Sequence, residues 1–317
     1  MTLLILGDAE RTLKLLGDES HDCCVTSPPY FGQRDYQSAG QIGQEHSVRE
    51  YLQRLWLVFD EVMRVLVRSG TLWVNIGDTY RDKCCLLVPE RFVLGMVKRG
   101  WLLRQKICWH KPNCKPESVK SRFTCDFEMI LFFVKNKRHY FAQQFEPYCE
   151  DTVRRCEQFI RRGEKFDAAR HKQDVAVPSQ APMRILERFV KKRFVKNLHV
   201  PGQSPNGMHV ERNAGRGKNV FSGRGRNMRS MWSLATAQYR GLHFATFPRA
   251  LAKRMIRAGC PQGGRVLDCF VGAGASMIAA EDCQCSGTGI DISETYLALA
   301  NQEILKAREK RAKAKKR

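Results

Sequence analysis

The fold is decided by one stretch of the sequence, Arg265-Val-Leu-Asp-Cys-Phe-Val-Gly-Ala-Gly-Ala-Ser-Met-Ile-Ala-Ala-Glu-Asp282. Its apolar beginning predicts a buried strand over residues 265–270, and Gly272-Ala273-Gly274 predicts a tight turn. Residues 275–282 are typical of a helix, and residues 287–292 predict the next strand. A strand, a glycine turn, a helix and a second strand make up a βαβ unit, in which the two strands lie parallel.

The segments outside this unit continue the alternation of strands and helices. Further strands are predicted at residues 3–6, 22–26, 71–76, 102–109 and 128–134. A short helix is expected at residues 11–16, and a longer one at residues 50–68, with a stop at Gly70. Ser293 can cap a last helix that runs into the basic end of the chain. This alternation predicts an α/β fold with a doubly wound, mostly parallel sheet.

Basic residues are concentrated in two parts of the chain. Residues 151–230 hold 19 Lys and Arg against 7 Asp and Glu, and residues 306–317 hold 8 against 1. The whole chain of 317 residues has a formal net charge of +22, and its 43% of apolar residues exclude a wholly disordered protein. An excess of this size indicates a polyanionic partner, usually a nucleic acid; a solvated surface is the alternative interpretation.

The cysteines and the apolar runs bear on the cellular compartment. The 13 cysteines include no CxxC pair, so neither a zinc site nor a disulfide framework is indicated, and no metal is expected. Unpaired cysteines in this number fit a reducing cytosol. The apolar run of residues 3–6 is short for a signal peptide, and no run approaches the about 18 residues of a membrane helix. We therefore expect a cytoplasmic protein without a membrane partner.

The glycine turn at residues 272–274 is the first candidate site. Glycine lets the backbone approach a ligand, and Asp291, at the end of the next predicted strand, could accept hydrogen bonds from ribose hydroxyls. Met277 stands where a dinucleotide fingerprint has its third glycine, and no P-loop lysine follows. The pattern therefore favours a nucleotide-like cofactor over a dinucleotide, and a simple packing turn is the alternative.

The second candidate site is Thr26-Ser27-Pro28-Pro29-Tyr30, which follows a predicted strand. Two consecutive prolines fix the backbone and remove two N–H donors, so the loop presents acceptors. Ser27 and the carbonyl of Pro28 can accept both hydrogens of a planar amine, while Tyr30 stacks on its ring. An ordinary proline turn is the alternative interpretation.

The two motifs, in this order, resemble the S-adenosylmethionine-dependent amino-methyltransferases of DNA in their circularly permuted β-type order, over most of the chain. Ser27-Pro28-Pro29-Tyr30 resembles the catalytic loop of that family. Asp8, after the first predicted strand, matches the acid that meets the adenine of the cofactor. Three segments resemble a further family segment beside the base pocket, namely Trp109–Asn113, Pro116–Ser118 and Phe127-Glu128.

The resemblance also implies which residues bind the cofactor, S-adenosyl-L-methionine. They are Asp8, Thr246, Phe247, Asp268, Phe270, Gly272, Gly274 and Asp291. Among them Asp291 falls on the ribose-binding acid of the family, and Thr246 and Phe247 lie in a segment similar to the one that closes over the methionine end of the cofactor.

The resemblance implies a Rossmann-like sheet of the methyltransferase type, with an inserted basic target-recognition region. In the family, Ser before Pro-Pro is associated with N4 of cytosine, and Asp or Asn there with N6 of adenine. Because each of these side chains can accept from an amine, Ser27 favours cytosine but leaves adenine open.

The family usually has Pro where Cys269 stands, and Ser and Thr where Ala273 and Ala275 stand. These departures weaken side-chain contacts but spare the backbone geometry of the two glycines.

The chemistry requires the two loops to lie side by side, although they are far apart in the sequence. The sulfonium of the cofactor makes its methyl group electrophilic, so the enzyme must place an amine nitrogen in line with it. Hydrogen bonds to Ser27 and the Pro28 carbonyl would stabilise the positive charge that grows on that nitrogen. The amine is paired inside a duplex, so the base must be flipped out.

We expect four parts of the chain: residues 1–145 as the catalytic half, 146–240 as the target-recognition insertion, 241–305 as the cofactor-binding half, and 306–317 as a basic tail. The residues expected to contact DNA are Arg216, Lys218, Arg224, Arg226 and Arg229. Glycine between arginines gives a backbone that can follow phosphates or enter a groove. A disordered linker of solvated charge is the alternative.

The expected partner is double-stranded DNA, in the cytoplasm of a bacterial or phage-infected cell. A homodimer and a cognate restriction endonuclease are left open. One rival hypothesis is a catalytically silent DNA-binding protein that has kept the fold. Another is an RNA or protein methyltransferase with a similar proline loop. Methyl transfer from labelled S-adenosylmethionine to DNA, RNA and protein substrates separates these hypotheses.

Overall fold

The computed structural model describes residues 2–35, 38–149, 151, 154, 226–236 and 247–315. The chain divides into two compact units, one of residues 1–142 with 230–317 and the other of residues 143–229. The expected insertion at 146–240 overlaps the second unit, and its boundaries and role stay predictions. No helix among the described residues is long and apolar enough to cross a membrane.

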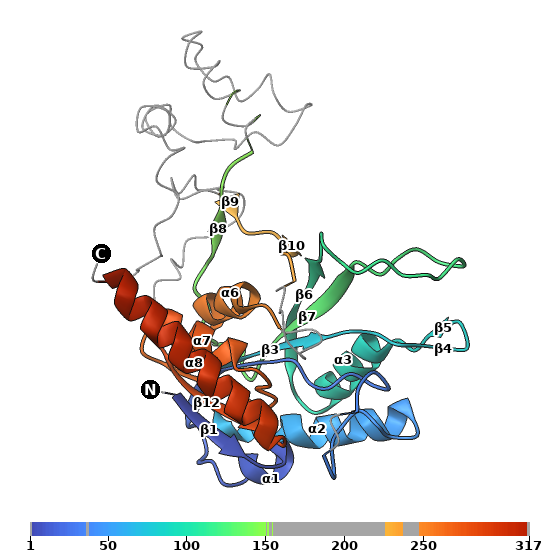
Figure 1. Cartoon of the computed structure of the whole chain (residues 1–317), viewed down its shortest axis with the longest axis horizontal. Helices are drawn as coiled ribbons and strands as arrows, with labels where there is room; N and C mark the ends of the chain where they lie inside the picture. Colours follow the sequence, from blue (N-terminus) through green and yellow to red (C-terminus); the bar gives the residue numbers. More distant parts are fainter. Residues whose placement is uncertain are drawn as a thin grey trace. The chain divides into compact units, whose positions relative to one another are not determined.

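A single sheet of eight strands forms the centre of the described part of the first unit (Figure 1). Its order is β1-β12-β11-β2-β3-β7-β6-β10. The strands are β1 (Thr2–Leu6), β2 (His21–Thr26), β3 (Leu66–Ile76), β6 (Leu102–His110), β7 (Phe127–Val134), β10 (Met231–Ser233), β11 (Arg265–Asp268) and β12 (Ser286–Asp291). Neighbouring strands are parallel except at β7, which runs antiparallel to both β3 and β6. The predicted mostly parallel sheet is confirmed.

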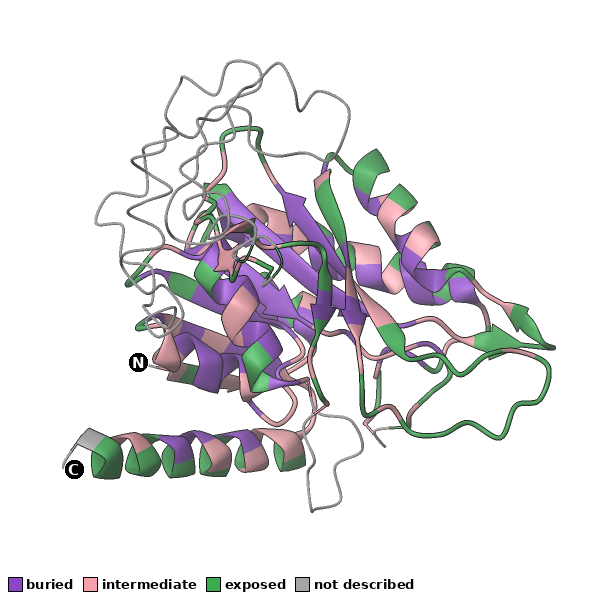
Figure 2. Ribbon diagram, turned by 90° about the horizontal axis from the view of Figure 1, so that it is seen from above, coloured by how far each residue is buried: buried purple, intermediate pink, exposed green. Residues whose placement is uncertain are grey.

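Two groups of helices cover the two faces of this sheet (Figure 1). One group contains α1 (Ala9–Leu13), α2 (Val48–Val65) and α3 (Val88–Lys98); the other contains α6 (Arg249–Gly259), α7 (Ala275–Asp282) and α8 (Glu294–Lys315). Figure 2 shows that buried residues are concentrated in the strands and in the helix sides that face them. A short hairpin, β4 (Tyr80–Arg81) with β5 (Cys84–Cys85), precedes α3. The arrangement is the doubly wound fold that alternating strands and helices predict.

The stop expected for α2 at Gly70 is wrong. The helix ends at Val65, and β3 begins at Leu66, which pairs with His21 of β2. Gly70 lies inside that strand, where a Cβ would come within 2.8 Å of the carbonyl oxygen of Val67. Leu66 is fully buried in the strand. An apolar residue at this position fits either a buried strand or the apolar face of the helix. The spacing of apolar residues therefore does not show where the helix ends.

The first helix also begins earlier than expected. It spans Ala9–Leu13 rather than residues 11–16, because the Asp8 side chain accepts a hydrogen bond from the backbone N–H of Arg11 at 3.0 Å. This N-cap places Asp8 directly after β1, at the carboxyl end of the strand.

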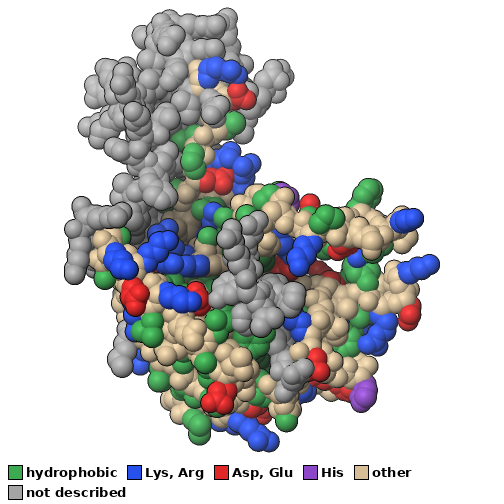
Figure 3. All heavy atoms as spheres, viewed as in Figure 1, with side chains coloured by type: hydrophobic (Ala, Val, Ile, Leu, Met, Phe, Trp, Pro, Cys, Tyr) green, Lys and Arg blue, Asp and Glu red, His purple; other side chains and the backbone are tan. Residues whose placement is uncertain are grey.

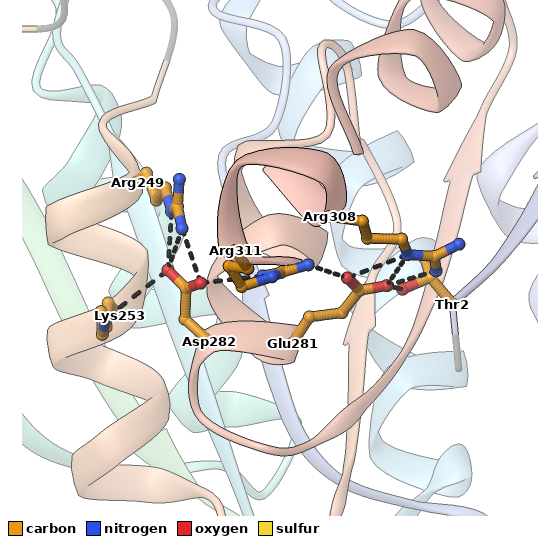
Figure 4. A network of polar contacts seen from close by, with 7 residues as sticks. All are labelled: Thr2, Arg249, Lys253, Glu281, Asp282, Arg308 and Arg311. Atoms are coloured by element: carbon orange, nitrogen blue, oxygen red, sulfur yellow. Dashed lines mark hydrogen bonds and ion pairs between the residues drawn. The ribbon is translucent and has the colours of Figure 1, made fainter. Parts of the chain in front are cut away.

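The basic end of the chain is helical, so the tail expected at residue 306 begins inside α8. On the face seen in Figure 3, Lys and Arg side chains gather around this end of α8. Arg308 pairs with Glu281, and Arg311 pairs with both Glu281 and Asp282 at the end of α7 (Figure 4). Arg249 of α6 donates to both carboxylate oxygens of Asp282, at 2.7 and 2.6 Å. Part of the charge that the sequence assigns to DNA attraction is therefore paired within the fold.

Candidate active site

The two candidate loops begin side by side at one edge of the sheet. β2 and β11 are adjacent and parallel, with Cys23 opposite Val266 and Cys24 opposite Leu267. The loop after β2 therefore starts beside the loop after β11, at the carboxyl edge where open α/β sheets bind ligands. A cavity of about 260 Å³ is lined by both. The expectation that the two loops face one site is confirmed.

Most of the residues predicted for the site line this cavity. Those that do so are Asp8, Ser27, Pro28, Pro29, Tyr30, Phe247, Asp268, Phe270, Gly272 and Asp291. Thr246 lies outside the described residues. Gly274 is not part of the lining.

Asp268, which lines the cavity, joins the two halves of the site. The Thr26 hydroxyl donates to Asp268 Oδ1 at 2.6 Å, the Ser276 hydroxyl donates to Oδ2, and the backbone N–H of Phe270 donates to Oδ1 at 3.1 Å. Burial raises the pKa of Asp268 to about 6, against the hydrogen bonds from Ser276 and Thr26, which lower it. The carboxylate ties the end of β2, the loop after β11 and the start of α7 together.

The two glycines of the turn do different things. Gly272 has φ of +49°, and a Cβ there would meet no atom within 4 Å. Gly274 has φ of +81°, and a Cβ there would come within 3.0 Å of the Cβ of Ala300 in α8. Glycine at 272 thus leaves the backbone open to the cavity. Glycine at 274, which the sequence assigned to cofactor binding, lets α8 pack against the start of α7.

Asp291 stabilises the turn from the end of β12. Its Oδ2 accepts from the backbone N–H of Gly272 at 2.8 Å, and its Oδ1 accepts from the N–H of Ser293 at 2.9 Å. Burial raises the pKa of Asp291, and these backbone hydrogen bonds oppose the rise. The backbone N–H of Gly7 donates to the Asp291 carbonyl at 2.9 Å, which brings Asp8 to the same end of the cavity.

Tyr296 also lines this end, and sequence analysis missed it. It lies in the first turn of α8, where the Ser293 hydroxyl accepts from its backbone N–H at 3.4 Å and caps the helix as expected. The sequence contained one signal for Tyr296, since it lies one turn after Ser293, the residue predicted to cap the last helix.

The proline loop is held from two sides. The Tyr51 hydroxyl of α2 donates to the Pro29 carbonyl at 2.7 Å. The ring of Tyr30 packs against Gly77, where a Cβ would come within 2.7 Å of ring atom Cε2. Only glycine at position 77 therefore allows Tyr30 to lie where it does.

Three polar side chains, Glu128, Asn75 and Lys111, meet beside Tyr30. Its hydroxyl donates to Glu128 Oε2 at 2.8 Å, and Asn75 Nδ2 donates to the Tyr30 oxygen at 2.8 Å and to Glu128 Oε2 at 2.7 Å. Lys111 Nζ lies 2.6 Å from Glu128 Oε1 and 5.3 Å from the ring centroid of Trp109. All five residues line the cavity. Sequence analysis missed Asn75, whose only signal is a polar side chain inside an apolar strand.

Two of the residues expected to contact DNA are described, and both belong to the second unit. Arg226 and Arg229 each lie 2.8 Å from Glu146, where β8 (Phe145–Glu146) pairs with β9 (Arg226–Asn227). Arg216, Lys218 and Arg224 lie outside the described residues. No group of His, Cys, Asp and Glu in the described part of the chain could hold a metal ion.

A family model described as DNA methylase, for N6 and N4 methyltransferases, matches residues 21–302. The chain belongs to this DNA methylase family. Among the relatives of this DNA methylase is the Type II methyltransferase M.SmaI of Serratia marcescens, 30% identical over 96% of the chain and 91% of that protein. The Type II methyltransferase M.Cfr9I of Citrobacter freundii is 29% identical over 94% of the chain and 85% of that protein.

Solved structures share the fold of this DNA methylase. The PvuII DNA methyltransferase, a cytosine-N4-specific enzyme, matches with a TM-score of 0.62 at 15% identity, over 96% of the chain and 90% of that structure. A DNA modification methylase of Thermus thermophilus, in complex with S-adenosyl-L-methionine, matches with a TM-score of 0.58 at 21% identity, over 97% of the chain and 94% of that structure. The methyltransferase-type sheet predicted from the sequence is confirmed.

Proposed function

We propose that this DNA methylase transfers a methyl group from S-adenosyl-L-methionine to the exocyclic N4 of a cytosine flipped out of duplex DNA. The observation that carries the proposal is the single cavity lined by both the Ser27–Tyr30 loop and the Gly272 turn. It offers one end to a methyl donor and another to a base. The PvuII enzyme, which shares this fold, is specific for the same target atom.

The cofactor end of the cavity fits S-adenosyl-L-methionine. The backbone at Gly272 is open to the cavity, because a Cβ there would meet nothing within 4 Å. A carboxylate has about four lone-pair sites, so Asp291 can accept from ribose hydroxyls in addition to its two backbone donors. Asp8, held beside it, can accept from the adenine amine. When bound, the cofactor supplies an electrophilic methyl group on a sulfonium.

The base end suits an exocyclic amine. Ser27 and the Pro28 carbonyl accept its two hydrogens, which directs the nitrogen lone pair away from the ring and stabilises the positive charge that develops during transfer. The Tyr30 ring, which packs against Gly77 and lines the cavity, can stack on the base, worth about 1–3 kcal/mol against the cost of flipping. This nitrogen chemistry needs no covalent intermediate on the enzyme.

The test uses the full chain, labelled S-adenosyl-L-methionine and duplex DNA. After transfer, the DNA is digested to nucleosides, which are separated and weighed. Label in N4-methylcytosine is the expected result. Label in N6-methyladenine would overturn the choice of base. Binding of DNA without transfer to any duplex would favour the catalytically silent protein, and preferential transfer to RNA or protein would overturn DNA as the substrate.

A further inference from the structure

Two exposed loops begin at the end of the cavity proposed for the base and extend away from the sheet (Figure 1). The first is the β4–β5 hairpin, which follows Gly77, the residue that packs against the ring of Tyr30. The second, the β6–β7 loop, consists of residues 111–126. It begins at Lys111, which lines the cavity and pairs with Glu128 just beyond the other end of the loop. Both loops are therefore rooted beside the ring proposed to stack on the base.

The β4–β5 hairpin has a fixed shape. At its root, Oδ1 of Asp78 accepts from the backbone N–H groups of Thr79, before β4, and of Val88, after β5, at 2.8 and 3.1 Å. At its tip, Asp82 and Lys83 have φ of 50° and 63°. Two consecutive residues in the left-handed region are typical of the tight turns that join two strands of a hairpin. The hairpin is thus a closed support and not an open loop.

Arg122 joins the β6–β7 loop to this support. Its guanidinium carbon lies 4.2 Å from the ring centroid of Tyr80 in β4. Its Nη1 donates to Glu117 Oε2 at 2.5 Å and to the carbonyl of Phe123 at 3.0 Å. A guanidinium that stacks on an aromatic ring and pairs with a carboxylate is held in one orientation. These contacts restrain the backbone at Phe123.

The side chain of Phe123 is left open by the fold. Among the large apolar side chains of the described residues it has the highest exposed fraction, 95%. It lies five residues before Glu128 in the cavity wall, so the two are at most about 18 Å apart even in a fully extended chain. Single apolar residues at a surface are common, but this ring stands on a restrained backbone close to a cavity. An aromatic ring presented in this way has the form of a wedge for a stack of bases.

The charge around Phe123 fits a duplex. Residues 111–126 hold 4 Lys and Arg against 2 Asp and Glu. Lys83 at the tip of the hairpin and Lys120 in the β6–β7 loop are exposed, and neither has a carboxylate partner in the part of the chain that the structure describes. Figure 3 shows Lys and Arg side chains on both projections. Exposed lysines attract DNA phosphates, which makes a duplex the partner that suits this surface.

We propose that Phe123 is a wedge residue that enters the DNA stack at the place of the flipped base and hinders the return of that base. The inference rests on the proposed methyl transfer to a flipped base. Flipping leaves a gap between the neighbouring base pairs, and DNA-binding proteins insert apolar side chains between base steps. Tyr30 stacks on the base inside the cavity, while Phe123 replaces part of the stacking that the base has lost in the duplex.

The first experiment compares Phe123→Ala with the unaltered chain on a duplex that the unaltered chain methylates. The single-turnover rate of methyl transfer should fall about 10- to 100-fold, as when one stack between a base and an aromatic ring is lost. The dissociation constant for S-adenosyl-L-methionine should change less than about 2-fold, and the melting temperature should not change, because the ring packs against nothing in the fold. Phe123→Trp, which keeps an aromatic wedge, should restore most of the rate.

The matched control is Leu15→Ala. Leu15 is also highly exposed, at 83%, but it lies between α1 and β2 and outside both loops. This variant should transfer methyl groups at the rate of the unaltered chain. A rate for Phe123→Ala equal to that of the control would overturn the inference, and so would a rate for Phe123→Trp as low as that of Phe123→Ala.

The second experiment separates a wedge from a simple DNA contact. In a duplex with an abasic site opposite the target, the target base is unpaired and is easier to flip. The loss caused by Phe123→Ala should therefore shrink to less than about 3-fold on this duplex. An equal loss on the paired and the abasic duplex would mean that Phe123 contributes only to DNA binding, which overturns the inference.

A direct measurement uses a fluorescent base analogue placed next to the target base, which becomes brighter when its neighbour leaves the stack. With cofactor bound, the unaltered chain should raise this fluorescence and Phe123→Ala should raise it less; equal increases would overturn the inference. The unaltered chain separates the inference from the proposed function. No transfer by the unaltered chain to any duplex would overturn the proposed function and the wedge with it. Equal transfer by the unaltered chain and Phe123→Ala would overturn the wedge alone.

Discussion

At the scale of single residues, buried carboxylates organise this site before any ligand is bound. Asp268 receives donors from β2, from the loop after β11 and from α7, so one side chain sets the spacing between the Ser27–Tyr30 loop and the Gly272 turn. Asp291 does the same for the glycine turn and the start of α8. A buried charge is costly, and these hydrogen bonds compensate it only while all of them are formed.

The raised pKa of Asp268, about 6, makes stability depend on pH in a definite direction. Between the ordinary value of 3.8 and about 6 the folded state holds a proton that the unfolded state has lost, so stability falls as pH rises through this window. We therefore compare the unfolding free energies of the unaltered chain and of Asp268→Asn. The unaltered chain should lose up to about 3 kcal/mol relative to the variant as the pH rises through this window. Urea titrations of both proteins from about pH 4 to about pH 7 measure it, since this range spans the window; a constant difference contradicts the prediction.

Ser27→Ala removes the acceptor proposed for the amine but leaves the cofactor end of the cavity intact. Turnover should therefore fall by about 100-fold or more, while the dissociation constant for S-adenosyl-L-methionine stays within about 2-fold. Rapid-quench methyl transfer and calorimetric titration give the two numbers. Equal losses in turnover and in cofactor binding would remove Ser27 from the role proposed here.

Asp291→Ala tests the end of the cavity that we propose to bind the cofactor. It removes the acceptor proposed for the ribose and also the two backbone contacts that shape the glycine turn. We expect cofactor affinity to fall at least about 10-fold, since hydrogen bonds to charged groups contribute about 1.5–3 kcal/mol each. Calorimetric titration with S-adenosyl-L-methionine measures it, and unchanged affinity would exclude Asp291 from the cofactor site.

At the scale of elements, the ends of α6, α7 and α8 are joined by one ion-pair network (Figure 4). Glu281 and Asp282 close α7 with two carboxylates that are only 11% and 7% exposed, and arginines from both neighbouring helices pair with them. Thr2 at the start of β1 donates to Glu281 at 2.7 Å. The network attaches the basic end of the chain to the sheet that carries the Gly272 turn.

Glu281 has a pKa lowered to about 2; its burial would raise the pKa, but hydrogen bonds from Arg308 and Thr2 prevail. Its contribution to stability is thus complete above the ordinary value of 4.5 and is lost as pH falls towards 2. Glu281→Gln should lower the free energy of unfolding at neutral pH by about 1–2 kcal/mol, allowing for solvent screening. The difference in free energy of unfolding between Glu281→Gln and the unaltered chain should become smaller at acidic pH.

The control for this prediction is Glu303→Gln on α8. Glu303 pairs with Lys306 one turn away at 2.8 Å, and the lysine is 66% exposed. Its replacement should change the free energy of unfolding by less than about 0.5 kcal/mol. Denaturant titrations of both variants at neutral pH decide whether the helix-end network, rather than charge in general, stabilises the fold.

At the scale of the whole molecule, part of the positive charge is paired within the fold, and the rest is available for the DNA contact predicted from the sequence. The arginines at the end of α8 have carboxylate partners. In the second unit Arg226 and Arg229 share Glu146. Because a phosphate can replace a carboxylate as partner of an arginine, these two residues can still bind DNA.

If Arg226 and Arg229 contact only phosphates, replacing both by Ala should weaken DNA binding evenly across sequences. The slope of log binding constant against log salt should flatten by about 2, since each phosphate contact contributes about 0.9. Fluorescence anisotropy with specific and unrelated duplexes over a salt series measures both effects. A loss confined to the specific duplex would instead assign base readout to these arginines.

Local sequence determined a large part of this protein. The βαβ unit around Gly272 was predictable because glycine turns, apolar strands and helix caps are properties of a few consecutive residues. The helix of residues 275–282 begins and ends where the sequence places it. Ser27-Pro28-Pro29-Tyr30 was predictable as an acceptor-only loop for a similar reason, since prolines remove donors in any fold.

Only the tertiary structure decided which side chains act together. The strand order places β2 beside β11, and that pairing, rather than any local pattern, brings Ser27 and Gly272 to one cavity. The tertiary structure also gives Gly272 and Gly274 different roles, because Gly274 packs against α8, a helix that begins about twenty residues later. The Glu128 network joins three segments whose spacing carries no signal in the sequence. Hydrogen bonds and packing between distant segments depend on topology, and a one-dimensional pattern does not contain it.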